Sequence, residues 1–100
     1  MIYSFLNEMI YNYHIRLARS ALNLTQGELA EQSGVSVPTI KTIELSKADA
    51  KLKNSKTIIL ALMRFFEDSG LIFIDEEDFI GVKIGKKIIK EDKKINNIKD

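Results

Sequence analysis

The chain is 100 residues long, with 45% hydrophobic and 29% charged residues, which predicts one globular domain and excludes a disordered or collagen-like chain. It has no Cys and one His, which excludes disulfides, thiolate zinc sites, cysteine nucleophiles and sites that need several His. The formal net charge of +1 conceals an uneven distribution of charged residues, because the middle of the chain and its end are locally basic. A polyanion would therefore meet one of these two regions.

The first half of the chain predicts two helices. Apolar residues recur at steps of three and four between Ile2 and Leu24, so we expect an amphipathic helix over much of residues 4–22. Thr25 and Glu28 have the spacing of a capping box, which places the start of a second, short helix directly after Thr25. Gly34 ends this helix, because glycine adopts the left-handed conformation without steric cost.

A third helix follows over residues 36–46. Ser36 is its expected N-cap, and Pro38 falls in the first turn, where the missing N–H removes no helical hydrogen bond. Pro38 also disfavours helical dihedral angles at Val37, so the start is open by one residue. A polar, basic connection over residues 46–54 comes next.

The last part of the chain predicts a fourth helix and a β-hairpin. The helix is capped by Ser55 and runs to Ser69, and its apolar residues occupy more than one face, so another element must cover it. The runs 71–74 and 79–84, separated by an acidic turn, read as a hairpin. An isolated hairpin is marginally stable, so it must pack on the fourth helix, pair with a second copy, or both.

The chain therefore divides into three parts. Residues 1–70 form a mainly α domain with a helix-turn-helix motif at 26–45, residues 71–85 form the hairpin as a dimerisation element, and residues 86–100 form a lysine-rich tail. The tail has no clear period and is either a frayed helix or a flexible segment. The single His14 is assigned no role and is expected at the surface or its boundary.

Two helices that cross near a right angle through a tight turn need a small residue at the contact. Ala30 supplies it, Gly34 makes the corner, and Ile40 and Ile43 point into the same seam, which Leu29 and Val35 flank. This arrangement predicts an outer face of the third helix formed by Val37, Pro38, Thr39, Lys41, Thr42 and Leu45. The major groove of B-DNA is about 12 Å wide and admits such a helix, while the N-terminus of the second helix suits a phosphate.

The stretch RLARSALNLTQGELAEQSGVSVPTIKTIE, within residues 15–66, resembles the lambda-repressor-like or Xre-type helix-turn-helix regulators. The resemblance implies a four- to five-helix DNA-binding domain, here followed by a C-terminal β-hairpin. It implies that Gln26 binds a DNA phosphate and that an Arg19–Glu44 pair ties the first helix to the end of the third. The candidate DNA contacts are Gln26, Ser36, Val37, Pro38, Thr39, Lys41, Thr42 and Lys47, and the structural residues are Arg19, Glu44, Ala30 and Gly34.

The sequence departs from the family pattern at two places. Leu45 and Ser46 stand where many relatives have Gly, and Val37 and Pro38 replace polar base readers. Discrimination between bases would then depend on thymine methyl groups, the hydroxyls of Thr39 and Thr42, and DNA shape. The hairpin also resembles an extension found in a small bacterial subset of these regulators.

We expect a dimeric DNA-binding repressor that recognises a near-palindromic operator on double-stranded DNA. The alternative is an antitoxin-like or adaptor protein in which Phe65, Phe66 and the hairpin bind a partner protein and DNA binding serves autoregulation. Catalysis, a cofactor and a metal are not expected, because the chain has no phosphate-binding glycine loop and no convincing pair of catalytic acids. No apolar run approaches the length of a membrane span and no signal peptide is apparent, which favours a cytoplasmic protein.

Overall fold

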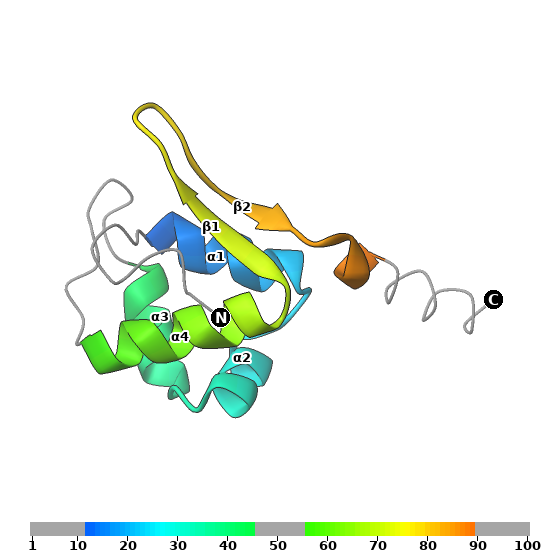
Figure 1. Ribbon diagram of the computed structural model, residues 1–100. Helices are drawn as coiled ribbons and strands as arrows, with labels where there is room; N and C mark the ends of the chain where they lie inside the picture. Colours follow the sequence, from blue (N-terminus) through cyan, green and yellow to red (C-terminus); the bar gives the residue numbers. More distant parts are fainter. Residues whose placement is uncertain (1–11, 46–55, 90–100) are drawn as a thin grey trace.

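A computed structural model describes residues 12–45 and 56–89 of the chain (Figure 1). The elements, in chain order, are α1 (Asn12–Ala21), α2 (Gln26–Ser33), α3 (Val37–Glu44), α4 (Lys56–Asp68), β1 (Leu71–Asp75) and β2 (Ile80–Ile84). Residues 86–89 add one helical turn. The mainly α fold with a C-terminal hairpin is therefore confirmed. The predicted start of the first helix, the connection with Lys47 and Ser55, and the end of the lysine-rich tail lie outside the described residues.

The predicted helix caps are present. The hydroxyl of Thr25 accepts from the N–H of Glu28 at 3.0 Å, and the Glu28 carboxylate accepts from the N–H of Thr25 at 2.8 Å, which completes the capping box of α2. Ser36 is the N-cap of α3, so Val37 is its first helical residue and Pro38 its second. The third helix ends at Glu44, earlier than predicted. Its cap residue Leu45 is 84% exposed, so no core contact favours a further turn.

The hairpin covers α4, as the sequence predicts. Leu62, Met63 and Phe66 of α4 are fully buried, and the ring of Phe66 meets Phe73 of β1 edge to face at 6.1 Å between centroids. Leu71 of β1 and Ile88 of the final turn belong to the same core. Gly70, with a φ of 106°, ends α4 and turns the chain into β1.

The two strands pair antiparallel, with Leu71 opposite Ile84 and Phe73 opposite Val82. The prediction that the second strand begins at Phe79 is wrong. Phe79 lies in the loop and is 71% exposed, because its carbonyl closes the tip by accepting from the N–H of Glu76 at 2.7 Å. The first strand correspondingly extends one residue further, to Asp75.

His14 is buried, which corrects the expectation that it lies at the surface or its boundary. Its Nε2–H donates to the carbonyl oxygen of Ile74 at 2.8 Å, and its ring meets Phe73 edge to face at 5.5 Å between centroids. These contacts fix the hairpin to α1. Sequence reasoning missed them because they join residues 60 positions apart.

The elements divide the molecule into two ends (Figure 1). The hairpin packs on α1 through β2 and on α4 through β1, while α3 contacts α1 and α2. As a result, the hairpin tip projects away from α2 and α3. In the described parts of the chain, no helix is long and apolar enough to cross a membrane.

Candidate nucleic-acid interface

The seam between α2 and α3 is built as predicted. Leu29, Ile40 and Ile43 are fully buried, and Ala30 packs against the same core at the crossing. Gly34 takes the left-handed conformation with φ 81° and ψ 5°, and its N–H donates to the carbonyl of Ala30 at 3.0 Å. The corner therefore holds the two helices at a fixed angle, and the seam residues are not available to a ligand.

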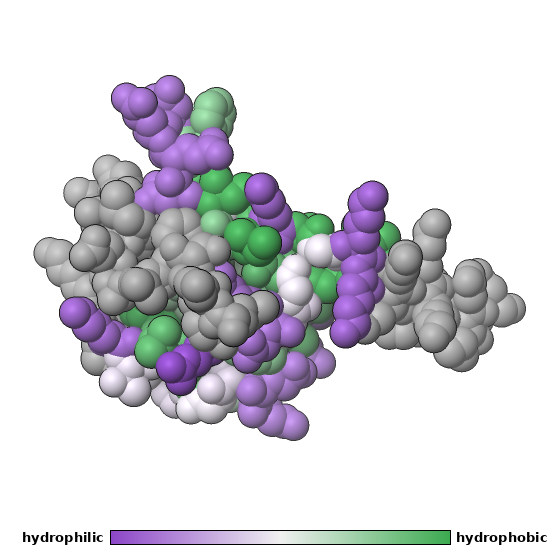
Figure 2. Space-filling view, viewed as in Figure 1, coloured by the Kyte–Doolittle hydropathy of each residue, from purple (hydrophilic) through white to green (hydrophobic). Residues whose placement is uncertain are grey.

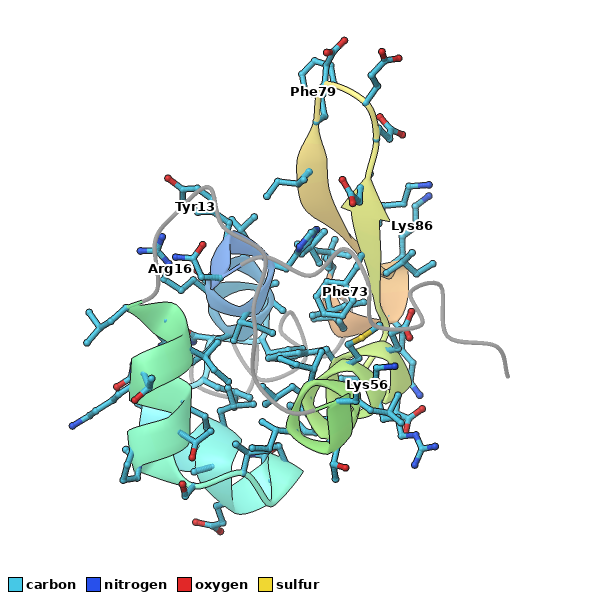
Figure 3. All side chains as sticks on the ribbon, turned by 90° about the vertical axis from the view of Figure 1, so that its left-hand side faces the viewer. Tyr13, Arg16, Lys56, Phe73, Phe79 and Lys86 are labelled. Atoms are coloured by element: carbon cyan, nitrogen blue, oxygen red, sulfur yellow. The ribbon has the colours of Figure 1, made fainter. Side chains whose placement is uncertain are left out.

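The outer face of α3, as defined above, lies at the molecular surface. Pro38, Lys41, Thr42 and Leu45 are exposed, and Val37 and Thr39 are half-buried. Figure 3 shows α3 at the edge of the molecule, with side chains projecting away from the other elements. The exposure of this face agrees with the sequence, whereas its contacts with DNA stay a prediction.

The hydroxyl groups on this face are already held by local hydrogen bonds. Ser36 donates to the Thr39 hydroxyl at 2.9 Å, so the Thr39 hydrogen is left for another acceptor. Thr42 donates to the carbonyl of Pro38 at 3.0 Å. Both threonine hydroxyls are therefore held by bonds within or next to α3.

The predicted Arg19–Glu44 pair is present and bidentate. Nε and Nη2 of Arg19 each donate to a different oxygen of Glu44 at 2.8 Å, and Nη1 donates to the carbonyl of Leu24 at 3.0 Å. Glu44 is only 6% exposed. Its hydrogen bond to the guanidinium raises the pKa of Arg19, so the guanidinium stays ionised. These bonds connect the end of α1, the following loop and the end of α3.

Gln26 joins this network, a contact that the sequence did not predict. Its Nε2 donates to Oε1 of Glu44 at 3.1 Å, the same oxygen that accepts from Arg19. An amide nitrogen has two hydrogens, so one remains available to an outside acceptor. No spacing rule reveals this contact, since residues 18 positions apart meet only when α2 and α3 cross.

The first turn of α2 adds further donors. Thr25 accepts from the N–H of Glu28, which leaves the N–H groups of Gln26 and Gly27 without a helical partner. Together with the helix dipole they form a local positive end beside the Gln26 side chain. The arrangement suits an anionic oxygen of a nucleic-acid backbone.

Other residues that the sequence singled out are not part of this interface as the structure describes it. Lys47 lies outside the described residues. Phe66 is fully buried and Phe65 is half-buried, so the prediction that they form a partner-binding surface is wrong for Phe66. Within residues 12–45 and 56–89, no three His, Asp or Glu side chains gather in a way that could hold a metal ion.

Comparison with known proteins agrees with this geometry. The helix-turn-helix family model matches residues 15–62, which include α1 from Ile15 onward, α2, α3 and the first half of α4. A search of curated proteins found no match. This family consists of DNA-binding regulators and is not an enzyme family. Together with the capped α2, the left-handed corner at Gly34 and the exposed outer face of α3, the match shows a helix-turn-helix domain of the lambda-repressor-like, Xre type over residues 15–62.

Proposed function

We propose that the protein is a sequence-specific regulator that binds double-stranded DNA as a dimer and represses transcription by covering a promoter. The observation that carries the proposal is the exposed outer face of α3, on a helix whose end is anchored by the Arg19–Glu44 pair. A fixed helix with an exposed flank fits the major groove without prior rearrangement.

Backbone contacts position the protein on the duplex. Gln26 donates its remaining amide hydrogen to a phosphate oxygen, and the N-terminus of α2 supports the same group. Lys41 is exposed on α3 and neutralises a neighbouring phosphate. Lys47, which follows α3 in the sequence, is a further candidate phosphate contact.

Base recognition falls to the first turns of α3. Val37 and Pro38 supply apolar contacts for thymine methyl groups. Thr39 has a hydrogen to donate to an acceptor on a base edge, and the exposed Thr42 lies on the same face of α3. Ser36 contributes by holding the Thr39 hydroxyl in place.

Two copies of α3 related by a two-fold axis read two half-sites about 34 Å apart, which makes the operator near-palindromic. A single small domain whose first base readers, Val37 and Pro38, are both apolar gives modest discrimination between bases by itself. Pairing two domains multiplies it, because mismatch penalties at well-separated positions are roughly additive.

A second candidate function is an antitoxin-like or adaptor role, in which a partner protein binds the hairpin. The exposed Ile72, Phe79 and Ile84 favour a protein contact at this end of the molecule. An antitoxin would co-purify with a stoichiometric partner, whereas a regulator acting alone would not.

Selection of bound sequences from random DNA at fixed salt tests the proposal. The wild type should enrich a two-half-site sequence. Gln26→Ala should weaken binding to all sequences by a similar factor, while Val37→Gln should change the enriched base at one position in each half-site. Unchanged affinity and unchanged preference in both variants would contradict the assigned surface.

A further inference from the structure

Arg16, in the middle of α1, is a half-buried cation without a charged partner. Across the part of the chain that the structure describes, its guanidinium has no carboxylate and no hydrogen-bond acceptor, and its Nε is buried. Buried polar atoms almost always have a partner, so an exception needs an explanation. The terminal nitrogens Nη1 and Nη2 keep their hydrogens for a ligand.

The ring of Tyr13 holds this side chain in place. The guanidinium carbon of Arg16 lies over the Tyr13 ring, 4.9 Å from its centroid. The two residues are three positions apart on α1 and therefore share one face of the helix. A guanidinium that stacks on an aromatic ring keeps the N–H groups in its own plane free to donate. The contact thus orients Arg16 without using its donors.

Arg16 lies next to the network at the end of α3. Arg19 is on the same face of α1, three residues later and about 4.5 Å further along the helix axis. Arg19 donates to Glu44 at the end of α3, and Gln26 of α2 donates to the same carboxylate. Figure 3 shows Arg16 and Tyr13 at the edge of the molecule that also carries α3. The guanidinium of Arg16 therefore borders the proposed DNA surface.

The charges on this side of the molecule favour an anion. The carboxylate of Glu44 is paired with Arg19, so it does not offset the charge of Arg16. Lys41 adds an exposed cation on α3. Figure 2 shows hydrophobic side chains along the hairpin, with mostly hydrophilic and neutral ones at the end of the molecule that carries α2 and α3. A polyanion would therefore meet the α3 side in preference to the hairpin.

We propose that Arg16 donates from Nη1 and Nη2 to a backbone phosphate of duplex DNA, at a contact separate from that of Gln26. An arginine fork matches two phosphate oxygens at once, which a lysine does not. Tyr13 is a positioning residue that holds the fork toward the DNA. The contact depends on the proposed DNA-binding function and extends the interface from α2 and α3 to α1. It carries no sequence information, because every nucleotide has the same phosphate.

Fluorescence anisotropy at several salt concentrations, with the duplex selected by the wild type, tests the contact. Arg16→Gln should weaken binding about tenfold for each protomer, because a charge-assisted hydrogen bond is lost. The slope of log K against log salt concentration should become less steep by about 0.9 per protomer, with the base preference unchanged. Arg16→Lys should restore the slope. Lys83→Gln, an exposed cation on the hairpin, is the control and should change neither value.

Two further variants separate the contact from a structural role of the side chain. Arg16→Met keeps the alkyl packing and should show the same change of slope as Arg16→Gln, so the test does not depend on the stability of one variant. Tyr13→Leu removes the ring and keeps the charge. It should weaken binding about threefold with the wild-type slope, since only the orientation of the guanidinium is lost. Urea denaturation shows which variants are folded at the assay temperature.

The outcomes distinguish this contact from the proposed function as a whole. A wild-type slope in both Arg16→Gln and Arg16→Met would overturn the contact, as would a changed base preference in either variant. If Gln26→Ala and Lys41→Ala weaken binding in that case, the proposed DNA surface stands without Arg16. If these two also bind like the wild type, the proposed surface itself is wrong.

Discussion

Glu44 is the residue at which three helices meet. Its two carboxylate oxygens accept from Arg19 of α1 and from Gln26 of α2, while its own backbone ends α3. A carboxylate that is 6% exposed retains its charge at low cost only when such donors surround it. The network therefore fixes the orientation of α3 and, at the same time, the position of the Gln26 amide.

Glu44→Gln should lower the free energy of unfolding by about 2 kcal/mol, because it leaves the Arg19 guanidinium without its bidentate partner. This loss is smaller than the loss from breaking a fully buried pair, because Arg19 is partly exposed. Urea denaturation measures the change. Glu31→Gln, at an exposed position of α2, is the control and should change stability by less than about 0.5 kcal/mol. Equal effects of the two substitutions would show that the network is not stabilising.

His14 makes stability depend on pH. Burial lowers the pKa of His14 below 6.5, and the bond to Ile74 and the charge of Asp75 oppose part of that shift. Between the lowered pKa and 6.5, the unfolded chain binds a proton that the folded chain does not, so stability falls as the pH decreases. Above this window the residue is neutral in both states and contributes no pH dependence.

We expect the wild type to lose more stability between pH 7.5 and pH 5 than His14→Gln, which keeps a hydrogen-bond donor but does not titrate. The difference should grow by at most about 1.4 kcal/mol per pH unit within the window. Denaturation series at several pH values measure it. Parallel curves for the two proteins would show that the His14 proton is not linked to folding.

At the scale of elements, the corner between α2 and α3 depends on backbone conformation more than on packing. A Cβ added at Gly34 would meet nothing within 4 Å, yet its φ of 81° is one that other residues rarely adopt. Gly27, within α2, has an ordinary helical backbone and equally little crowding, since the nearest atom would be the Thr25 hydroxyl at 3.8 Å.

Opposite effects of alanine at these two glycines are therefore expected. Gly34→Ala should destabilise the protein by about 1 kcal/mol, through left-handed strain alone. Gly27→Ala should stabilise it by about 0.5 kcal/mol, because alanine loses less backbone entropy in a helix. Thermal unfolding of both variants tests the sign. Destabilisation by both would mean that the space around α2 is tighter than the structure shows.

The elements predicted from the sequence were those with local signals. The predicted positions of the caps at Thr25 and Ser36 and of the corner at Gly34 are confirmed. Each of them depends only on residues that are neighbours in the sequence. The predicted end of α3 and the predicted start of β2 differ from the observed ones. Exposed residues such as Leu45 and Phe79 have no core contact that would fix where an element ends. The exposure of the outer face of α3 followed from helical periodicity. The burial of His14 and the Gln26–Glu44 bond did not, since both depend on how distant elements meet.

At the scale of the whole molecule, the proposed DNA contacts lie at the end with α2 and α3, and the hairpin tip projects from the opposite end. Lys41 is the described cation on the outer face of α3, and Lys83 is exposed on the hairpin. Because each phosphate contact releases condensed counterions, removal of a contacting cation reduces the salt dependence of binding.

Lys41→Ala should make the slope of log K against log salt concentration less steep by about 0.9 for each protomer bound to duplex DNA. Lys83→Ala should leave the slope unchanged, because it lies at the end of the molecule away from α3. Fluorescence anisotropy titrations at several salt concentrations measure both slopes. A reversed order of the two effects would place the DNA at the hairpin.

An NMR titration of the isotope-labelled protein with its selected duplex tests most directly whether α3 contacts DNA. Amide shifts should change at Gln26 and Gly27 and along α3 from Val37 to Thr42, with no change at the tip residues Glu76 to Asp78. Shift changes confined to the hairpin and to Lys86 and Lys87, with α3 unaffected, would contradict this contact.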